Sequence, residues 1–467
     1  MNKLFLYNTL TRQKQEFIPL KKKKVGLYTC GPTVYDYPHI GNFRAYLFED
    51  TLKRVLKYND YKVKHVMNIT DVGHLTSDAD EGEDKLEKGS RREGKSVWDI
   101  AKFYTKVFKD NLVELNIVEP NTWCKATDYI KDQIKFARVL QKKGFTYLTS
   151  DGLYFDTAKY PGYADLAKLN LAGQQEGARV EVNTEKRNPT DFALWKFSPK
   201  NEQRQMEWKS PWGIGFPGWH LECSAMSIKE LGEEFDLHAS GIDHIPVHHT
   251  NERAQNWGLT TRRQGSGWQA GNETVKYWVH SEFLLVDGGK MGKSLGNLIT
   301  LKQIQEKGFS AMAFRYFTLQ AHYRSKLNFT WEALEAAQNG LNNLIKEIST
   351  LDKPRGSFIE FQKKFETAIN DDLNTPEALA VLQALLKSDL PSSAKRAGIM
   401  KFDKILGLGL NTFKVEKKLS SEVQNLINQR QEARKNKDYK KSDELRKKIE
   451  EAGIKLKDLP DGTYEIE

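Results

Sequence analysis

The stretch Cys30-Gly31-Pro32-Thr33-Val34-Tyr35-Asp36-Tyr37-Pro38-His39-Ile40-Gly41-Asn42 joins two segments with different apolar spacing. The apolar run 25–29 before it is typical of a buried strand, and the spacing over 43–50 after it predicts a helix. A glycine-containing turn between a strand and a helix leaves backbone N–H groups free, and a helix N-terminus favours an anion such as phosphate. With a cysteine and a histidine beside this turn, the stretch indicates a nucleotide site.

Strand and helix patterns alternate through the N-terminal part of the chain. Residues 62–69 read as a strand and residues 97–104 as the start of a helix, which predicts parallel βαβ pairing up to about residue 140. A hairpin is predicted over 145–156, and glycine- and proline-rich sequence continues from there to Trp219. We therefore expect an α/β fold whose parallel sheet is interrupted by an insertion.

A second strand–helix run follows the insertion. Strands are predicted over 235–239 and 282–286, with a helix from about His249 between them. Beyond about residue 300 the pattern is helical, and we expect no further strand until a short one at 464–466. The C-terminal third should therefore be all-α.

Composition narrows the class of protein. The 467 residues are enough for several domains, and 39% hydrophobic and 29% charged residues exclude global disorder. No run approaches the roughly 18 apolar residues of a membrane span, and the first eight residues are too polar for a secretory signal, so we expect a cytoplasmic protein. Three cysteines are typical of free thiols or metal ligands, and a net charge of +10 favours a polyanionic partner.

A second motif, Gly289-Lys290-Met291-Gly292-Lys293-Ser294-Leu295-Gly296-Asn297, follows the predicted strand 282–286. Two lysines around a glycine suit a mobile loop that brings cations to a polyphosphate, although most such strings are exposed basic turns. A Walker A loop would need a glycine five residues before Gly292, and that position holds Asp287. The Walker interpretation is therefore excluded.

Two short strings carry a resemblance. His39-Ile40-Gly41-Asn42 and Lys290-Met291-Gly292-Lys293-Ser294 resemble the HIGH and KMSKS motifs of class I aminoacyl-tRNA synthetases. Together with Cys30, the string Pro217-Gly218-Trp219-His220-Leu221-Glu222-Cys223-Ser224-Ala225-Met226 and the string 248–252, they resemble the cysteinyl-tRNA synthetase family. The strings 186–189 and 372–376 extend this resemblance along essentially the whole chain.

The resemblance implies a Rossmann-like parallel-sheet catalytic domain with an insertion, followed by all-α C-terminal domains. The expected boundaries are 1–143 for the first half of the catalytic domain, 144–218 for the connective insertion, 219–300 for the second half, 301–350 for a stem-contact linker, 351–417 for a helical domain and 418–467 for a C-terminal tRNA anticodon-binding domain.

Four side chains suit a metal ion. His248 and Glu252 stand four residues apart and would face the same side of a helix, and with Cys30 and Cys223 they form a donor set that suits Zn²⁺. A single cysteine such as Cys30 or Cys223 is more often a small buried residue than a ligand, and a single His–Glu pair is usually part of a solvated helix face. The joint match of all four residues to the family favours the metal site instead.

Other histidines compete for this role. His238, His244 and His249 are alternative ligands; the resemblance favours His248 and places His238 beside the amino-acid pocket. The remaining cysteine, Cys124, lies outside the pattern and is interpreted as structural.

The resemblance implies a two-step ligase reaction. L-Cysteine is activated with ATP and Mg²⁺ to cysteinyl-adenylate and pyrophosphate, and the cysteinyl group then passes to the 3′ end of its tRNA, with one zinc ion selecting the substrate thiolate. The implied catalytic residues are His39, Asn42, Lys290 and Lys293; those that bind ATP are His39, Gly41, Asn42, Lys290, Lys293 and Ser294; and those that bind cysteine are Thr70, Trp219 and His238. A monomer without a membrane partner is expected.

Departures from the family pattern keep two alternatives open. Asn42 stands for the second histidine of HIGH, Gly292 for the serine of KMSKS, and Thr250 for an acidic residue. The alternatives are a related cysteine:amino-sugar ligase and a non-catalytic tRNA-binding paralogue. A basic helical pair around Arg430 and Lys440 is predicted to contact tRNA phosphates, which favours the synthetase.

The end of the chain departs from the pattern once more. Tyr464 replaces the usual tryptophan of the family tail. The tRNA contact that the tryptophan makes in the family is therefore not assigned to Tyr464.

Overall fold

The computed structural model describes residues 3–74, 84–169, 184–199, 204–264, 267–269, 271–292, 295–410, 421–436, 438–452, 454, 456–458 and 464–466. The chain forms two compact units, Met1–Asn411 and Thr412–Glu467. No helix in these ranges is both long and apolar enough to cross a membrane. The six predicted domain ranges stay predictions.

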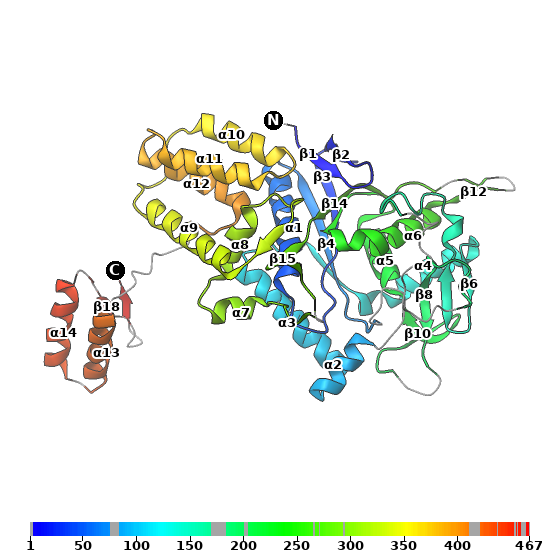
Figure 1. Cartoon of the computed structure of the whole chain (residues 1–467), viewed down its shortest axis with the longest axis horizontal. Helices are drawn as coiled ribbons and strands as arrows, with labels where there is room; N and C mark the ends of the chain where they lie inside the picture. Colours follow the sequence, from blue (N-terminus) through cyan, green and yellow to red (C-terminus); the bar gives the residue numbers. More distant parts are fainter. Residues whose placement is uncertain are drawn as a thin grey trace. The chain divides into compact units, whose positions relative to one another are not determined.

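A five-stranded parallel sheet organises the first unit (Figure 1). The strand order is β14-β11-β3-β4-β5, so strands from before and after the insertion lie side by side. The strands span Lys24–Thr29 (β3), Lys62–Ile69 (β4), Thr122–Lys125 (β5), Phe235–Gly241 (β11) and Val275–Ser281 (β14). The predicted strands at 25–29, 62–69 and 235–239 are confirmed.

Alternate residues of each strand face opposite sides, because successive side chains of a strand point to opposite faces. Leu27 and Met67 pack with helix α1 in one apolar core, whereas Tyr28 and Val66 belong to a second core on the other face. The helices of this region span Ile40–Tyr58 (α1), Lys85–Glu93 (α2), Val97–Glu114 (α3), Ile130–Lys142 (α4), Trp219–Leu231 (α5) and Thr250–Thr260 (α6). The predicted helices at 43–50, 97–104 and after His249 are confirmed.

The insertion forms its own antiparallel sheet, in the order β6-β7-β8-β10-β9. These strands span Thr146–Leu148, Gly152–Phe155, Phe192–Phe197, Trp208–Ser210 (β9) and Gly213–Pro217 (β10). The predicted hairpin is β6–β7, which pair antiparallel. Leu153 and Trp195 of the insertion share a core with Tyr28 and Val66 of the parallel sheet, so the insertion is packed against that sheet.

The prediction of no strand between about residue 300 and residue 464 was wrong. The edge strand of the parallel sheet is β14, whereas the predicted strand at 282–286 is present as β15 (Leu284–Val286) in a separate sheet ordered β16-β15-β17. Its partners are β16 (Gly289–Lys290) and β17 (Leu327–Phe329), so a strand also occurs beyond residue 300. This short strand pairs parallel with β15, a long-range pairing that local apolar spacing does not reveal.

Helices dominate the rest of the first unit. They span Leu301–Glu306 (α7), Ala311–Leu319 (α8), Trp331–Ser349 (α9), Ile359–Asn370 (α10), Thr375–Lys387 (α11) and Ser392–Leu406 (α12). Their apolar faces join the core of α1, so the helical region and the sheet form one body. Asp50 of α1 binds the buried Arg315 of α8 at 2.6 Å within this shared interior.

Three antiparallel hairpins contain the remaining described strands: β1 (Phe5–Asn8) with β2 (Gln13–Glu16), β12 (Arg262–Gln264) with β13 (Gly267–Gln269), and β18 (Leu456–Asp458) with β19 (Tyr464–Ile466).

The second unit pairs two helices, α13 (Ser421–Lys435) and α14 (Tyr439–Glu451), with the hairpin β18–β19. The predicted strand at 464–466 is confirmed. Arg430, which we expected at a tRNA-facing surface, is 1% exposed and makes a bidentate ion pair with Asp458 at 2.9 Å. A guanidinium held this way is structural, whereas Lys440 is exposed.

Candidate active site

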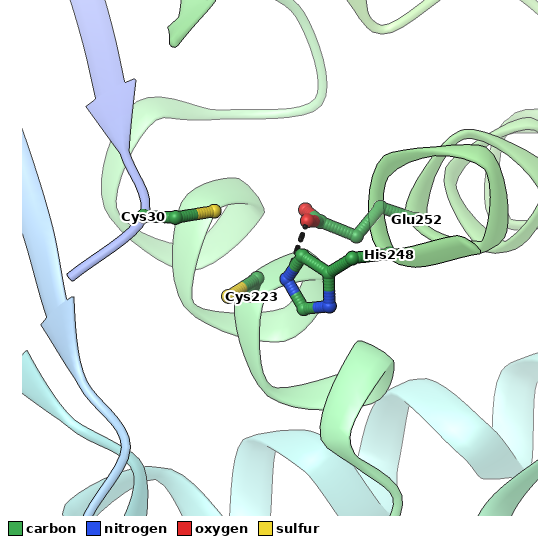
Figure 2. Close-up of side chains that lie close together, drawn as sticks. All are labelled: Cys30, Cys223, His248 and Glu252. Atoms are coloured by element: carbon green, nitrogen blue, oxygen red, sulfur yellow. Dashed lines mark ion pairs between the residues drawn. The ribbon is translucent and has the colours of Figure 1, made fainter. Parts of the chain in front are cut away.

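Four buried side chains converge at the C-terminal ends of β3 and its neighbours (Figure 2). Cys30 follows β3, Cys223 lies on α5, His248 lies on the helical turn Ile245–His249, and Glu252 lies on α6. Each offers one donor atom, and these four atoms all lie within 4.8 Å of one another. The structure therefore brings together the four residues that the sequence pattern selected for a metal ion.

The charges in this cluster depend on one another. His248 Nε2 lies 3.0 Å from Glu252 Oε1. Burial opposes the charged form of His248, but the neighbouring Glu252 raises its pKa to about 10. Burial likewise opposes ionisation of Glu252, but His238 and His248 lower its pKa to about 2. Each partner therefore favours the charged form of the other.

The two thiols differ. Burial raises the pKa of Cys30 well above its ordinary value. Burial also opposes ionisation of Cys223, but its hydrogen bond with Cys30 lowers its pKa overall. Two buried sulfurs, an imidazole and a carboxylate within 4.8 Å of one another are donors that a metal ion can share, so the donor set fits a metal ion.

A second donor set overlaps the first. Cys30 and Glu252 are shared, and His238 and His249 replace the other two ligands. His249 Nε2 lies 3.3 Å from Cys30 Sγ, and His238 Nε2 lies 3.1 Å from Glu252 Oε2. Two of the competing histidines that the sequence suggested are therefore within reach of the same centre.

His238 was expected beside the amino-acid pocket, and its ring does not line the described cavity. It is fully buried and stacks on Trp278 with ring centroids 4.8 Å apart. The reason is strand alternation: Leu237 and Ala239 face α1, so the residue between them faces the opposite core. Its position supports a role in orienting Glu252.

One cavity of about 360 Å³ connects the cluster with the turn that begins α1. Its lining includes Cys30, Cys223 and His248 as well as His39 and Asn42. Gly31 forms part of the wall, and a Cβ there would lie 1.8 Å from the carbonyl oxygen of Asn68, so only glycine fits. The thiol-rich cluster and a phosphate-friendly helix start thus face the same space.

His39 is the N-cap of α1 and forms a reciprocal capping box with Asn42. The backbone N–H of Asn42 donates to His39 Nδ1 at 3.3 Å, and the backbone N–H of His39 donates to Asn42 Oδ1 at 3.1 Å. Because Nδ1 is an acceptor here, the proton of the neutral imidazole lies on Nε2. Gly41 allows close contact, since a Cβ there would lie 3.0 Å from His39 Nδ1.

The second motif lies beside this turn. The backbone N–H of Ile40 donates to the carbonyl of Ile299 at 2.8 Å, which ties the loop after Lys290 to the start of α1. Lys290 is exposed in β16, and the side chain of Asn297 bridges its carbonyl and the N–H of Gly292. Met291 and Gly292 line the cavity. The predicted contacts of Lys293 and Ser294 lie outside the described residues.

Of the two remaining predicted cysteine contacts, only Trp219 is among the residues that line the cavity. Trp219 lines the cavity and packs on His248 with ring centroids 4.3 Å apart. Thr70 is buried, and its Oγ1 donates to Glu222 Oε2 at 3.0 Å. Glu222 also binds His74 Nε2 at 2.6 Å, a pairing that sequence reasoning missed. The only sequence signal for it was its place between His220 and Cys223 in a string otherwise rich in functional residues.

Comparisons with known proteins agree with this geometry. A family model described as the tRNA synthetases class I (C) catalytic domain matches residues 16–339. Models described as the cysteinyl-tRNA ligase anticodon binding domain and the DALR domain match residues 416–464 and 364–388. Among solved structures, a Mycobacterium tuberculosis methionyl-tRNA synthetase is similar with a TM-score of 0.52 at 14% identity, over 82% of this chain and 90% of that chain. An Agrobacterium radiobacter LeuRS in complex with tRNA has a TM-score of 0.59 at 13% identity, over 84% of each chain.

The fold and the paired motifs are those of a class I aminoacyl-tRNA synthetase. A cysteine–tRNA ligase of Burkholderia lata is 50% identical over 463 residues, 98% of this chain and 96% of its own length. One of Treponema denticola is 45% identical over 490 residues, 97% and 98% of the two chains. The chain belongs to the cysteine–tRNA ligase family, as the resemblance indicated.

Proposed function

We infer that the chain is a cysteine–tRNA ligase, an enzyme that activates L-cysteine with ATP and transfers the cysteinyl group to its tRNA. The observation that carries this inference is the cavity lined both by Cys30, Cys223 and His248 and by His39 and Asn42. A site for a thiol and a site for a nucleotide in one space suit a reaction between those two substrates.

Cys30, Cys223, His248 and Glu252 would hold a zinc ion, because two thiols, an imidazole and a carboxylate match its ligand preferences. A bound zinc ion would stabilise a substrate thiolate, which a serine hydroxyl cannot match. Trp219 and Thr70 would enclose the rest of the amino acid. The hydrogen bond to Glu222 fixes the Thr70 side chain, which would shape the pocket wall without adding a charge.

The phosphates of ATP, with their Mg²⁺, would lie at the start of α1. An oxygen of the cysteine carboxylate attacks the α-phosphorus, and pyrophosphate leaves. A ribose hydroxyl at the 3′ end of tRNA then attacks the carbonyl carbon, and AMP leaves. His39 donates from Nε2 and Asn42 from Nδ2 to the phosphate oxygens of ATP, and Gly41 leaves room for them. Two cations and a hydroxyl come from Lys290, Lys293 and Ser294. No covalent enzyme nucleophile is needed.

The two alternatives have less support. A cysteine:amino-sugar ligase has no use for a tRNA-binding tail, and residues 416–464 match an anticodon-binding model. A non-catalytic paralogue does not require the intact four-ligand cluster. A cytoplasmic location and a monomeric state stay predictions.

The experiment is cysteine-dependent ATP–pyrophosphate exchange, followed by charging of the tRNA for cysteine. We expect exchange with cysteine and at least about 100-fold less with serine, because a dedicated partner left unfilled discriminates more strongly than an apolar pocket. Absence of exchange in zinc-replete protein would contradict the proposed function.

A further inference from the structure

Exposed aromatic side chains gather beside the cavity. Tyr37, in the turn before α1, is 45% exposed, and Phe103, on α3, is 39% exposed. Their ring centroids lie 6.2 Å apart in an edge-to-face arrangement. Both also contact the buried ring of Tyr104, at 5.2 Å and 5.1 Å. The three rings therefore form a single packed group with two members open to solvent.

This aromatic group begins in the cavity and continues outside it. Tyr37 and Tyr104 are among the lining residues, whereas Phe103 is not. Tyr104 is fixed from behind, because its hydroxyl donates to Glu93 Oε1 at 2.7 Å. A ligand that occupied the cavity and extended over α3 would meet Tyr37 first and Phe103 next.

The surroundings of these rings are cationic. Residues 85–110 carry eight lysines and arginines against four aspartates and glutamates. Lys95 Nζ lies 5.1 Å from the centroid of the Phe103 ring. Glu93, which accepts the hydrogen bond from Tyr104, is itself bound by Arg92 at 2.9 Å and by Lys95 at 3.3 Å. The field around the exposed rings therefore favours a polyanion.

Exposed aromatic rings among cations suit one kind of ligand especially well. Single-stranded nucleic acids are bound by stacking of bases on aromatic rings, while cations neutralise the phosphates. A double helix cannot use such rings, because its bases are already stacked and paired. A small substrate inside the cavity does not reach Phe103, which lies outside the lining.

We propose that Tyr37 and Phe103 form a stacking surface for the unpaired nucleotides at the 3′ end of tRNA. The proposal rests on the proposed function, because transfer brings that end into the cavity. Tyr37 receives the nucleotide nearer the reacting ribose, and Phe103 the one before it. The surface acts in the transfer step and has no part in adenylate formation.

The test is Phe103→Ala in the full-length chain, with Phe103→Trp as the variant that keeps a stacking ring. Trp98→Ala is the matched control, because Trp98 lies on the same helix, is 47% exposed, and contacts no other aromatic ring among the described residues. We expect Phe103→Ala to lower kcat/KM for tRNA in aminoacylation by about tenfold, and Phe103→Trp to stay within about twofold of the unchanged chain.

Two further measurements separate the possible causes. ATP–pyrophosphate exchange needs no tRNA, so it stays unchanged in Phe103→Ala if the surface serves tRNA alone. Absence of exchange in the unchanged chain would contradict the ligase function, whereas normal exchange with normal aminoacylation in Phe103→Ala would contradict only the stacking surface. In competition assays, tRNA that lacks its 3′-terminal unpaired nucleotides should bind the unchanged chain and Phe103→Ala equally well. A tenfold effect that persists with the shortened tRNA, an equal effect of Trp98→Ala, or a raised KM for ATP would overturn the proposal.

Discussion

Asn42 has two roles in the turn before α1, and one substitution separates them. Its Oδ1 accepts the hydrogen bond from the backbone of His39 at 3.1 Å and so completes the capping box. Its Nδ2 is the donor that we assign to ATP. Asn42→Asp keeps the acceptor oxygen but replaces the amide donor by a carboxylate oxygen. The cap is therefore kept, while the contact with phosphate becomes repulsive.

The size of the effect follows from electrostatics. Two like charges about 4 Å apart near a protein surface repel by about 4 kcal/mol, and salt and Mg²⁺ reduce this. A rate falls tenfold for about each 1.4 kcal/mol, so we expect exchange to fall by about 10²–10³-fold. Stability should change by less than about 0.5 kcal/mol, since the cap remains and an acidic residue is favourable in the first turn of a helix.

The assay is ATP–pyrophosphate exchange at saturating cysteine, combined with urea unfolding followed by circular dichroism. Asn42→Ala is the control: it removes the Asn42 half of the capping box and the donor without adding charge, so it should cost about 1 kcal/mol of stability and about tenfold in rate. The reasoning is refuted if Asn42→Asp exchanges at the unchanged rate, or if Asn42→Ala is impaired as severely as Asn42→Asp.

Three further changes test other parts of the structure. Cys223→Ser removes one of two thiol donors, so zinc content measured by elemental analysis should fall well below one per chain. Burial raises the pKa of Asp71 to about 6, above the 3.8 of the exposed group, so the folded state keeps a proton that the unfolded state loses. Stability should therefore fall as pH rises from about 4 to 6, and Asp71→Asn should gain about 2–3 kcal/mol over the unchanged chain across this window. Arg430→Ala removes the bidentate partner of Asp458 and should destabilise the second unit by about 2 kcal/mol, measured by thermal unfolding.

Each of these has an outcome that would count against it. Full zinc occupancy in Cys223→Ser would exclude that thiol as a ligand. A pH-independent difference between Asp71→Asn and the unchanged chain would show that Asp71 titrates normally in the folded state. Unaltered unfolding of Arg430→Ala, with weaker tRNA binding, would return Arg430 to the tRNA-facing surface.

The central strands and the metal-type cluster could be predicted because their signals are local. The run 25–29 is apolar, and His248 and Glu252 stand one helical turn apart, so spacing alone predicts a strand and a shared face. Cys30 and Cys223 needed the family resemblance, since nothing in their separate surroundings indicates that they meet. The structure places all four donors within 4.8 Å of one another.

What could not be predicted depends on long-range pairing. Leu284–Val286 has the apolar run of a sheet strand, yet its partner is β17, more than 40 residues later, while Val275–Ser281 occupies the sheet edge. The orientation of His238 follows from which face of β11 packs on α1, and spacing within one strand does not give that. Arg430 was misjudged because a basic run does not reveal which cation meets Asp458.

The strand order of the parallel sheet has a consequence for synthesis on the ribosome. β3 lies between β4 and β11, and about 200 residues separate β3 from β11 in the chain. At about 5–20 residues per second, the edge of β3 waits about 10–40 s for its second neighbour. An unpaired strand edge is a site for association with other chains, so the nascent protein is exposed to aggregation through β3 during that interval. Cys30 and Cys223 meet only at the end of this wait, so the four-donor cluster forms only once β11 has joined the sheet.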